Sequence, residues 1–245
     1  MNSENAVKAP LDRLASSHAS VPYPWPVAGA WRAEDTALVA IDMQKDFLDP
    51  RGYFASLGES LEHTRRSVAP ARNALAAARA LGLTVIHTRE GHRRDLSDLN
   101  DCKRLRAARA GAAIGSPGPL GRLLVRDEKG WDFIEEMRPL PGEPVVDKCG
   151  NGAFYATDLE QILRSRGIRH LLLLGVTTDV CVSSTMREAN DRGFDCLLLE
   201  DCCGAAHPDL HQGVLNSLER EGGIFGAYAN SQAFFDQYLS TPPAG

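Results

Sequence analysis

A cysteine stands where an apolar strand gives way to a helix. Residues 171–176 form an apolar run typical of a strand buried on both faces of a parallel sheet, and from Val182 the apolar residues recur at helical spacing. The start of a helix presents unpaired N–H groups and a positive dipole end, which favour thiolate over thiol. Cys181 is therefore a candidate nucleophile, and the amides of Thr177 and Cys181 could hold an oxyanion. As a free cysteine, Cys181 is equally a candidate for a small buried apolar residue.

Two charged residues follow other predicted strands. Asp42 comes directly after the apolar run 36–41, and Lys148 comes after the run 144–147. The carboxyl ends of parallel strands share one crevice, so we expect Asp42, Lys148 and Cys181 to meet there. Such a group can attack a carbonyl carbon: Lys148 stabilises the thiolate, and Asp42 accepts and returns the proton. Taken singly, Asp42 could be a turn cap and Lys148 a surface charge.

The elements that must position these side chains alternate between strand and helix. We expect strands at 36–41, 84–88, 144–147, 171–176 and 195–199 and from 222, and helices at 67–81, 158–166 and 212–221, from 182, and at 231–239. This alternation predicts an α/β fold with a doubly wound parallel sheet. We expect residues 1–35 to form an extended N-terminal arm and residues 36–240 to form one domain.

Two stretches lie outside this alternation. The arm carries Tyr23, Trp25 and Trp31, aromatic side chains that need cover, so it should lie on the domain or on a neighbouring subunit. Residues 93–131 are a long excursion, and such segments are usually functional or form an oligomer contact.

Composition excludes several classes of function. The net charge is −5, no basic cluster is interleaved with aromatics, and no apolar run approaches the ~20 residues that span a bilayer, so we expect no nucleic acid and no membrane. The first residues have no apolar signal core, and the six cysteines include no C-x-x-C, so we expect a cytoplasmic protein with reduced thiols. His87 and His92 have no third ligand nearby in the sequence, so we expect no metal and no cofactor.

Three sequence blocks resemble the isochorismatase-like cysteine hydrolases. They are IDMQKDF at 41–47, Lys148 with GAFYATDL at 152–159, and GVTTDVCVSSTMREANDRG at 175–193. The resemblance covers roughly residues 36–239. It implies a six-stranded sheet with helices on both faces, a catalytic triad of Asp42, Lys148 and Cys181, a cis peptide between Val176 and Thr177, and often a homotetramer.

Other segments resemble one branch of that family, biuret hydrolase and its triuret-hydrolysing relatives. They are PYPWP at 22–26, HTREGHR at 87–93, GSPGPLGR at 115–122 and LLLEDCCGA at 197–205. The substrate-binding residues implied are Phe47, Asn151, Val176 and Glu221. Biuret enzymes have Lys in place of Asn151 and Gln in place of Glu221. A carboxylate at 221 could accept from the adjacent N–H groups of a longer ureide such as triuret.

The resemblance also separates this chain from two other branches. Nicotinamidases carry an Asp-x-His metal cluster after the first block, and residues 51–58 supply none. Isochorismatase itself lacks the cysteine that is present here as Cys181.

The sequence thus predicts a metal-free cysteine amidohydrolase that cleaves a terminal C–N bond of a small linear ureide. Triuret would give carboxybiuret and biuret would give allophanate, each with ammonia, and Glu221 favours triuret slightly. Two alternatives stay open: a ureidoacrylate-type amidohydrolase of pyrimidine breakdown, whose substrate carboxylate needs an uncompensated Arg or Lys, and a catalytically silent oligomeric binding module.

Overall fold

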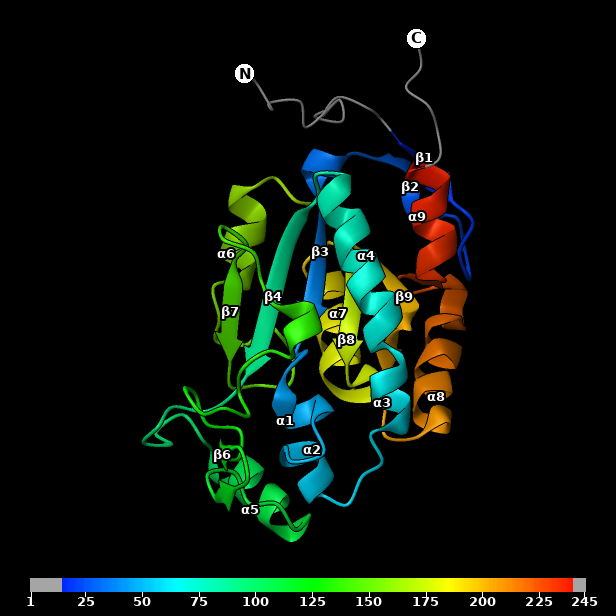
Figure 1. The fold of residues 1–245 in the computed structure, drawn as a ribbon. Coiled ribbons are helices and arrows are strands. Elements are labelled where there is room, and N and C mark those ends of the chain that lie inside the picture. The colour runs from blue at the N-terminus through cyan, green and yellow to red at the C-terminus, as the bar shows by residue number, and fades with distance from the viewer. Residues whose placement is uncertain (1–14, 240–245) are drawn as a thin grey trace, which may run out of the picture.

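A six-stranded parallel sheet forms the centre of the computed structural model, which describes residues 15–239. The strands lie in the order β10-β9-β8-β3-β4-β7 (Figure 1). Their bounds are β3 Thr36–Ile41, β4 Thr84–Glu90, β7 Val145–Lys148, β8 His170–Val176, β9 Asp195–Gly204 and β10 Ala227–Ala229. The predicted fold class is confirmed. β3 and β8 are buried along their whole length because they are central strands covered on both faces.

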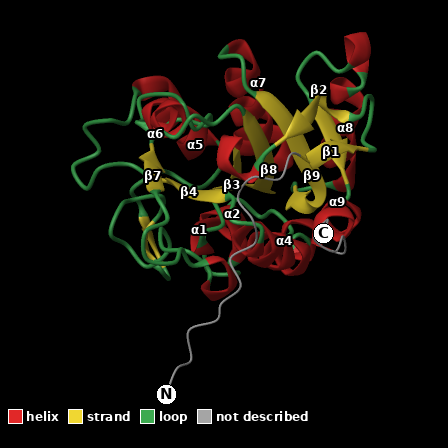
Figure 2. Ribbon diagram, turned by 90° about the horizontal axis from the view of Figure 1, so that it is seen from above, coloured by secondary structure: helices red, strands yellow, loops and turns green. Residues whose placement is uncertain are grey.

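Helices cover both faces of the sheet (Figure 2). One face packs against α4 (Val68–Ala80) and α9 (Ser231–Leu239), and the other against α6 (Leu159–Ser165), α7 (Ser183–Asp191) and α8 (Pro208–Leu218). Alternate residues of the strands therefore contribute their side chains to two apolar cores, one on each side of the sheet.

Further helices lie around the carboxyl ends of the strands. They are α1 (Lys45–Leu48), α2 (Tyr53–Ser56), α3 (Glu62–Arg66) and α5 (Asp101–Arg109), together with a π turn at Thr178–Val182. The described chain also has 3₁₀ turns at Ala33–Asp35, Glu135–Met137 and Arg220–Gly222. In Figure 1, α1, α2 and α5 lie beyond the lower end of the sheet, where β7 and β8 point. This end of the molecule holds the long excursion.

The excursion is mostly irregular. Within residues 93–131 the structure shows α5 and a small antiparallel pair, β5 (Pro117–Gly118) and β6 (Gly121–Arg122). The buried carboxylate of Asp46 joins it to the domain by accepting hydrogen bonds from the amides of Leu124 (3.1 Å) and Tyr53 (3.2 Å). The excursion is therefore fixed against the loops that follow β3.

The described part of the arm packs on the domain. It forms a hairpin of β1 (Ala15–His18) and β2 (Trp25–Trp31), while residues 1–14 lie outside the described residues. Trp25 and Trp31 are buried against Phe234 of α9, with ring centroids 5.9 and 5.8 Å away. The aromatic residues of the arm thus find their cover in the same chain.

The C-terminal elements differ from the predicted ones. α8 begins at Pro208, which is suited to the first helical turn, and ends at Leu218 rather than at residue 221. The last strand begins at Ala227 rather than at 222, because Gly222, Gly223 and Gly226 have φ of 73°, 90° and 123°, outside the extended region.

No helix among residues 15–239 is long and apolar enough to cross a bilayer.

Candidate active site

The three predicted triad residues meet at the carboxyl end of the sheet. The Lys148 Nζ lies 2.7 Å from Oδ2 of Asp42 and 3.5 Å from Sγ of Cys181. Sheet register causes this meeting, because β3 pairs with β8 up to Ile41 and Gly175, and β7 lies two strands away beyond β4. The prediction that these side chains share one crevice is confirmed in its geometry.

Asp42 is fully buried and firmly held. Its Oδ1 accepts a hydrogen bond from the Thr88 hydroxyl at 2.6 Å, and its own backbone N–H donates to the same hydroxyl oxygen at 3.2 Å. Burial raises the pKa of Asp42 above its ordinary value, while the Lys148 ammonium opposes the shift. A carboxyl group with a raised pKa can carry a proton during a reaction, as the predicted role of Asp42 requires.

Lys148 bears a positive charge with no exposure to solvent. Its ammonium also donates to the carbonyl oxygens of Gly150 and Asn151, both at 2.9 Å, so the loop after β7 wraps around it. Burial alone would lower the pKa of Lys148, but the negative charges of its neighbours outweigh burial and raise that pKa above its ordinary value. Lys148 is thus a fixed cation beside the Cys181 sulfur.

Glu90, the last residue of β4, is a fourth member that sequence reasoning missed. Its Oε2 lies 3.2 Å from both Lys148 Nζ and Cys181 Sγ, and its Oε1 lies 2.6 Å from Nζ of Lys103 on α5. Burial alone would raise the pKa of Glu90, but the Lys148 and Lys103 charges outweigh it and bring that pKa to about 2. Glu90 follows the same strand-end rule as Asp42 and Lys148, which is the signal that could have identified it.

Cys181 lies in the π turn Thr178–Val182, which leads directly into α7. Its sulfur donates a hydrogen bond to Glu90, and burial raises its pKa well above the ordinary value, with Glu90 and Asp42 adding to the rise and Lys148 opposing it. The loss of water and the two carboxylates therefore act against the thiolate that the helix start was expected to favour, while the Lys148 ammonium acts for it.

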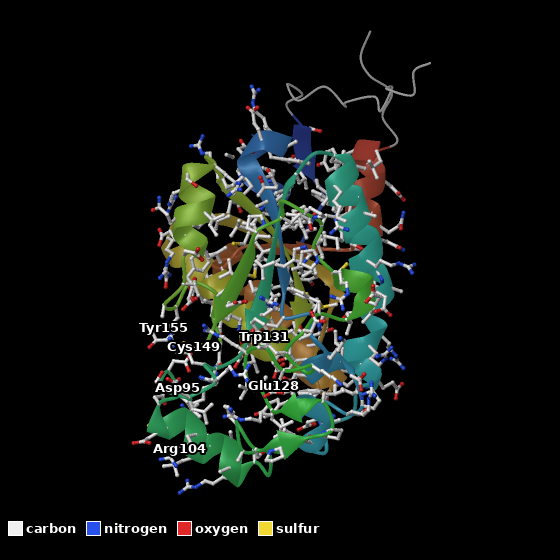
Figure 3. All side chains as sticks on the ribbon, turned by 60° about the vertical axis from the view of Figure 1, so that its left-hand side comes forward. Asp95, Arg104, Glu128, Trp131, Cys149 and Tyr155 are labelled. Carbon is white, nitrogen blue, oxygen red and sulfur yellow. The ribbon has the colours of Figure 1, made fainter. Side chains whose placement is uncertain are left out.

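A pocket of about 620 Å³ opens above this group. Cys181 and Glu90 lie among its lining residues, and its walls come from α2, α5, the loop after β7 and the π turn. In Figure 3, Cys149 and Tyr155 lie between the end of the sheet and the α5 region, on the side where the pocket lies. The volume suits a small molecule rather than a polymer chain.

The structure separates the predicted substrate-binding residues into two groups. Phe47 and Asn151 line the pocket, as does Thr177, which was predicted for the oxyanion hole. Val176 is fully buried and is not among the lining residues, although its peptide bond to Thr177 is cis as expected.

Glu221 lies away from the pocket. It is exposed, with φ of 52°, in the turn that precedes β10, and β10 runs parallel to β9. The turn before a parallel strand lies at the amino edge of the sheet, whereas the pocket lies at the carboxyl edge. The predicted placement of Glu221 facing the crevice is therefore wrong within this chain.

Asp42, Glu90 and Cys181 offer atoms that lie within 4.8 Å of one another, a spacing that a metal ion could use. The Lys148 ammonium lies within 3.5 Å of all three and supplies the positive charge there. His87 and His92 bond instead to Glu143 at 2.9 Å and Asp98 at 3.1 Å. The donor set thus fits an ammonium better than a metal ion.

A six-stranded parallel sheet with a buried lysine, two carboxylates and a cysteine at its carboxyl edge defines a class of α/β hydrolytic enzymes. Residues 36–229 match the isochorismatase domain model, and the chain belongs to the isochorismatase family.

Relatives and solved structures agree with this membership. Ureidoacrylate amidohydrolase RutB of Pantoea ananatis (strain LMG 20103) is 32% identical over 190 residues, which cover 76% of each chain. A cysteine hydrolase from Pseudomonas syringae pv. phaseolicola 1448A aligns with a TM-score of 0.70 at 26% identity, over 85% of this chain and 94% of that one. N-carbamoylsarcosine amidase from Thermoplasma acidophilum aligns with a TM-score of 0.61 at 26% identity, over 80% and 96%.

Proposed function

We propose that this protein is a cysteine amidohydrolase that releases ammonia from a small ureido compound. The observation that carries the proposal is Cys181, which lines the pocket with its sulfur 3.5 Å from the buried Lys148 ammonium. A nucleophile beside a fixed cation and a carboxyl group able to carry a proton is the equipment for acyl transfer.

The reaction proceeds in two halves. Sγ of Cys181 attacks the terminal ureido carbon while its proton passes to Asp42, and Asp42 returns that proton to the leaving nitrogen as ammonia departs. Water then adds to the thioester with Asp42 as base, the C–S bond breaks, and the sulfur regains a proton. The net change is R–NH–CO–NH₂ plus H₂O to R–NH–COOH plus NH₃. The Thr177 and Cys181 amides hold the oxyanion in both halves.

The charge of the pocket favours a ureido compound that also carries a carboxylate. Arg106 lines the pocket, its Nε donates to the carbonyl oxygen of Cys102 at 3.2 Å, and no carboxylate among residues 15–239 forms an ion pair with it. Lys103, the neighbouring cation, is already paired with Glu90. Arg106 is thus the uncompensated cation that an acid such as ureidoacrylate requires.

This reverses the slight preference for triuret. That preference depended on Glu221, which lies outside the pocket. The similarity to the relative named ureidoacrylate amidohydrolase also supports the acid. Triuret and biuret remain neutral candidates for the same chemistry.

A substrate panel tests the proposal. Ureidoacrylate, N-carbamoylsarcosine, biuret, triuret and nicotinamide should be scored by released ammonia, with isochorismate scored by its product. We expect ammonia from the ureido acids first, and none from Cys181→Ser. Absence of ammonia from every member would support the silent binding module instead.

Arg106→Met separates the acid from the neutral substrates. Loss of a charge-assisted contact worth about 1.5–3 kcal/mol should raise KM for the acid by on the order of tenfold or more and leave biuret and triuret unchanged. Arg104→Met is the matched control, because Arg104 lies on the same helix but pairs with Asp101. Equal effects of Arg106→Met on acidic and neutral substrates would contradict the assignment.

We also propose that the protein is cytoplasmic and that it forms a homotetramer. Light scattering on the purified full chain tests the tetramer directly.

A further inference from the structure

One contact connects the excursion to the reactive centre. Nζ of Lys103 on α5 lies 2.6 Å from Oε1 of Glu90 and donates to the carbonyl oxygen of Cys149 at 2.7 Å. The other oxygen of Glu90 accepts from Cys181 and Lys148. Lys103 is therefore one carboxylate away from the sulfur.

We propose that Lys103 is a positioning residue of the reaction, whose ammonium neutralises Glu90 so that the centre around Cys181 carries no net charge. The inference rests on the proposed function, in which Cys181 is the nucleophile. It also gives the 93–131 excursion a role, since α5 carries both Lys103 and the pocket residue Arg106.

The balance of charges carries the argument. Asp42 and Glu90 bring two negative charges, and Lys148 and Lys103 bring two positive ones. When Cys181 passes its proton to Asp42, the sum stays at zero because the proton remains within the site. Without Lys103 the buried group would carry one excess negative charge, and a further negative charge on sulfur would be disfavoured.

Among the residues that the structure describes, no other group around Glu90 replaces that charge. Tyr53 of α2 faces Glu90, and burial raises the pKa of Tyr53 to about 12, so it is a neutral phenol. His92 follows β4, and burial lowers its pKa, which disfavours a positive charge on the ring. The cations that pair with Glu90 in the described chain are Lys148 and Lys103.

The geometry of α5 also favours this role over simple packing. Ala107 is the residue of α5 that is buried, so the helix makes little apolar contact with the domain. The Lys103 side chain instead reaches inward and is 19% exposed, whereas that of its neighbour Arg104 is 54% exposed and pairs with Asp101. Arg104 lies on α5 at the outer end of the molecule in Figure 3.

The test measures the sulfur itself. Iodoacetamide alkylation of Cys181 in the full chain is followed by peptide mass spectrometry from pH 7 to 10, alongside kcat/KM. Lys103→Met should slow Cys181 alkylation at a given pH by on the order of tenfold, corresponding to about one unit of thiol pKa. Arg104→Met should leave the alkylation rate at the parent value.

A second substitution distinguishes charge from structure. Adding Glu90→Gln to Lys103→Met restores zero net charge, so the double variant should recover most of the alkylation rate that Lys103→Met loses. If the double variant stays as slow as Lys103→Met, or if Lys103→Met alkylates like the parent, the proposal is overturned.

Two further variants cover a failure of Lys103→Met to fold. Lys103→Arg keeps the charge and should alkylate within about threefold of the parent, whereas Lys103→Gln should be slow. Equal rates for the two would overturn the proposal. Failure of the proposed function gives a different result. An active Cys181→Ser variant would show that Cys181 is not the nucleophile, whereas the comparison of Cys181 alkylation rates between the parent and the Lys103 variants would still be valid.

Discussion

The Cys181 sulfur donates a hydrogen bond to Oε2 of Glu90 across 3.2 Å, and burial raises the pKa of this thiol well above its ordinary value. Helix position alone would favour the thiolate, but burial and two nearby carboxylates act in the opposite direction. In the proposed reaction the sulfur therefore passes its proton to a neighbouring base, Asp42, as it attacks.

Replacement of Cys181 by serine should lower ammonia release by on the order of 10³-fold or more, because a hydroxyl is a far weaker nucleophile in this setting. The fold should persist, since the change is small, and circular-dichroism melting checks it. Cys102→Ser is the control, because Cys102 is exposed and should leave turnover intact. Full activity in Cys181→Ser would exclude the thioester route.

Asp42 should set the acid limb of the pH profile. It must be ionised to accept the thiol proton, and burial raises its pKa above the ordinary 3.8. Activity should therefore be present above this raised pKa and be lost as pH falls through it. A plot of log kcat/KM against pH measures the limb, and Asp42→Asn should remove it and lower kcat by about 10²–10⁴-fold. A limb at the ordinary carboxyl value would contradict this role.

Lys148→Met should destabilise the fold strongly. The change leaves Asp42 and Glu90 buried and close together without the cation between them. Breaking a buried pair in this way typically costs about 3–5 kcal/mol of unfolding free energy. Lys45→Met is the matched control: the Lys45 side chain is 28% exposed, and the loss of its pair with Asp132 should cost up to about 1 kcal/mol. Urea denaturation at pH 7 measures the unfolding free energy of both variants. Similar losses for Lys148→Met and Lys45→Met would contradict the inference that the Lys148 ammonium stabilises the buried carboxylates.

The arm should behave as part of the domain. Trp31 is 3% exposed and stacks on Phe234, so Trp31→Ala should cost about 3–5 kcal/mol of unfolding free energy and lower the Tm. Val27, on the same strand, is 73% exposed, and Val27→Ala should change stability by no more than about 0.5 kcal/mol. Thermal melting of both variants measures whether the arm contributes to the stability of the domain. An unchanged Tm in Trp31→Ala would mean that the arm is not tightly docked.

Chelation should leave the rate unchanged. The Lys148 ammonium lies among Asp42, Glu90 and Cys181, where a metal would need to bind. Ammonia release should be measured before and after dialysis against EDTA, with zinc and iron added back. Activity that disappears on dialysis and returns with a metal would show that a metal site exists.

The sequence by itself determined the sheet and the meeting of three charged or reactive side chains at its carboxyl edge. Apolar runs ending at Ile41 and Val176 identify buried parallel strands, because a strand covered on both faces must be apolar throughout. Parallel strands also place their carboxyl ends together, so the sequence predicts that Asp42, Lys148 and Cys181 share one crevice. Both inferences depend on local pattern and on a general rule of topology.

Only the tertiary structure decided the state and the surroundings of the sulfur. Lys103 comes from an excursion without periodicity, so nothing local indicates that it reaches Glu90. The protonation of Cys181 depends on how much water is excluded and on which charges lie close to it, and both are properties of the packed molecule. Glu221 shows the reverse: its charge suggested a role, but the direction of β10 places it at the opposite edge of the sheet. These three features depend on long-range contacts and on desolvation, which a local sequence pattern does not encode.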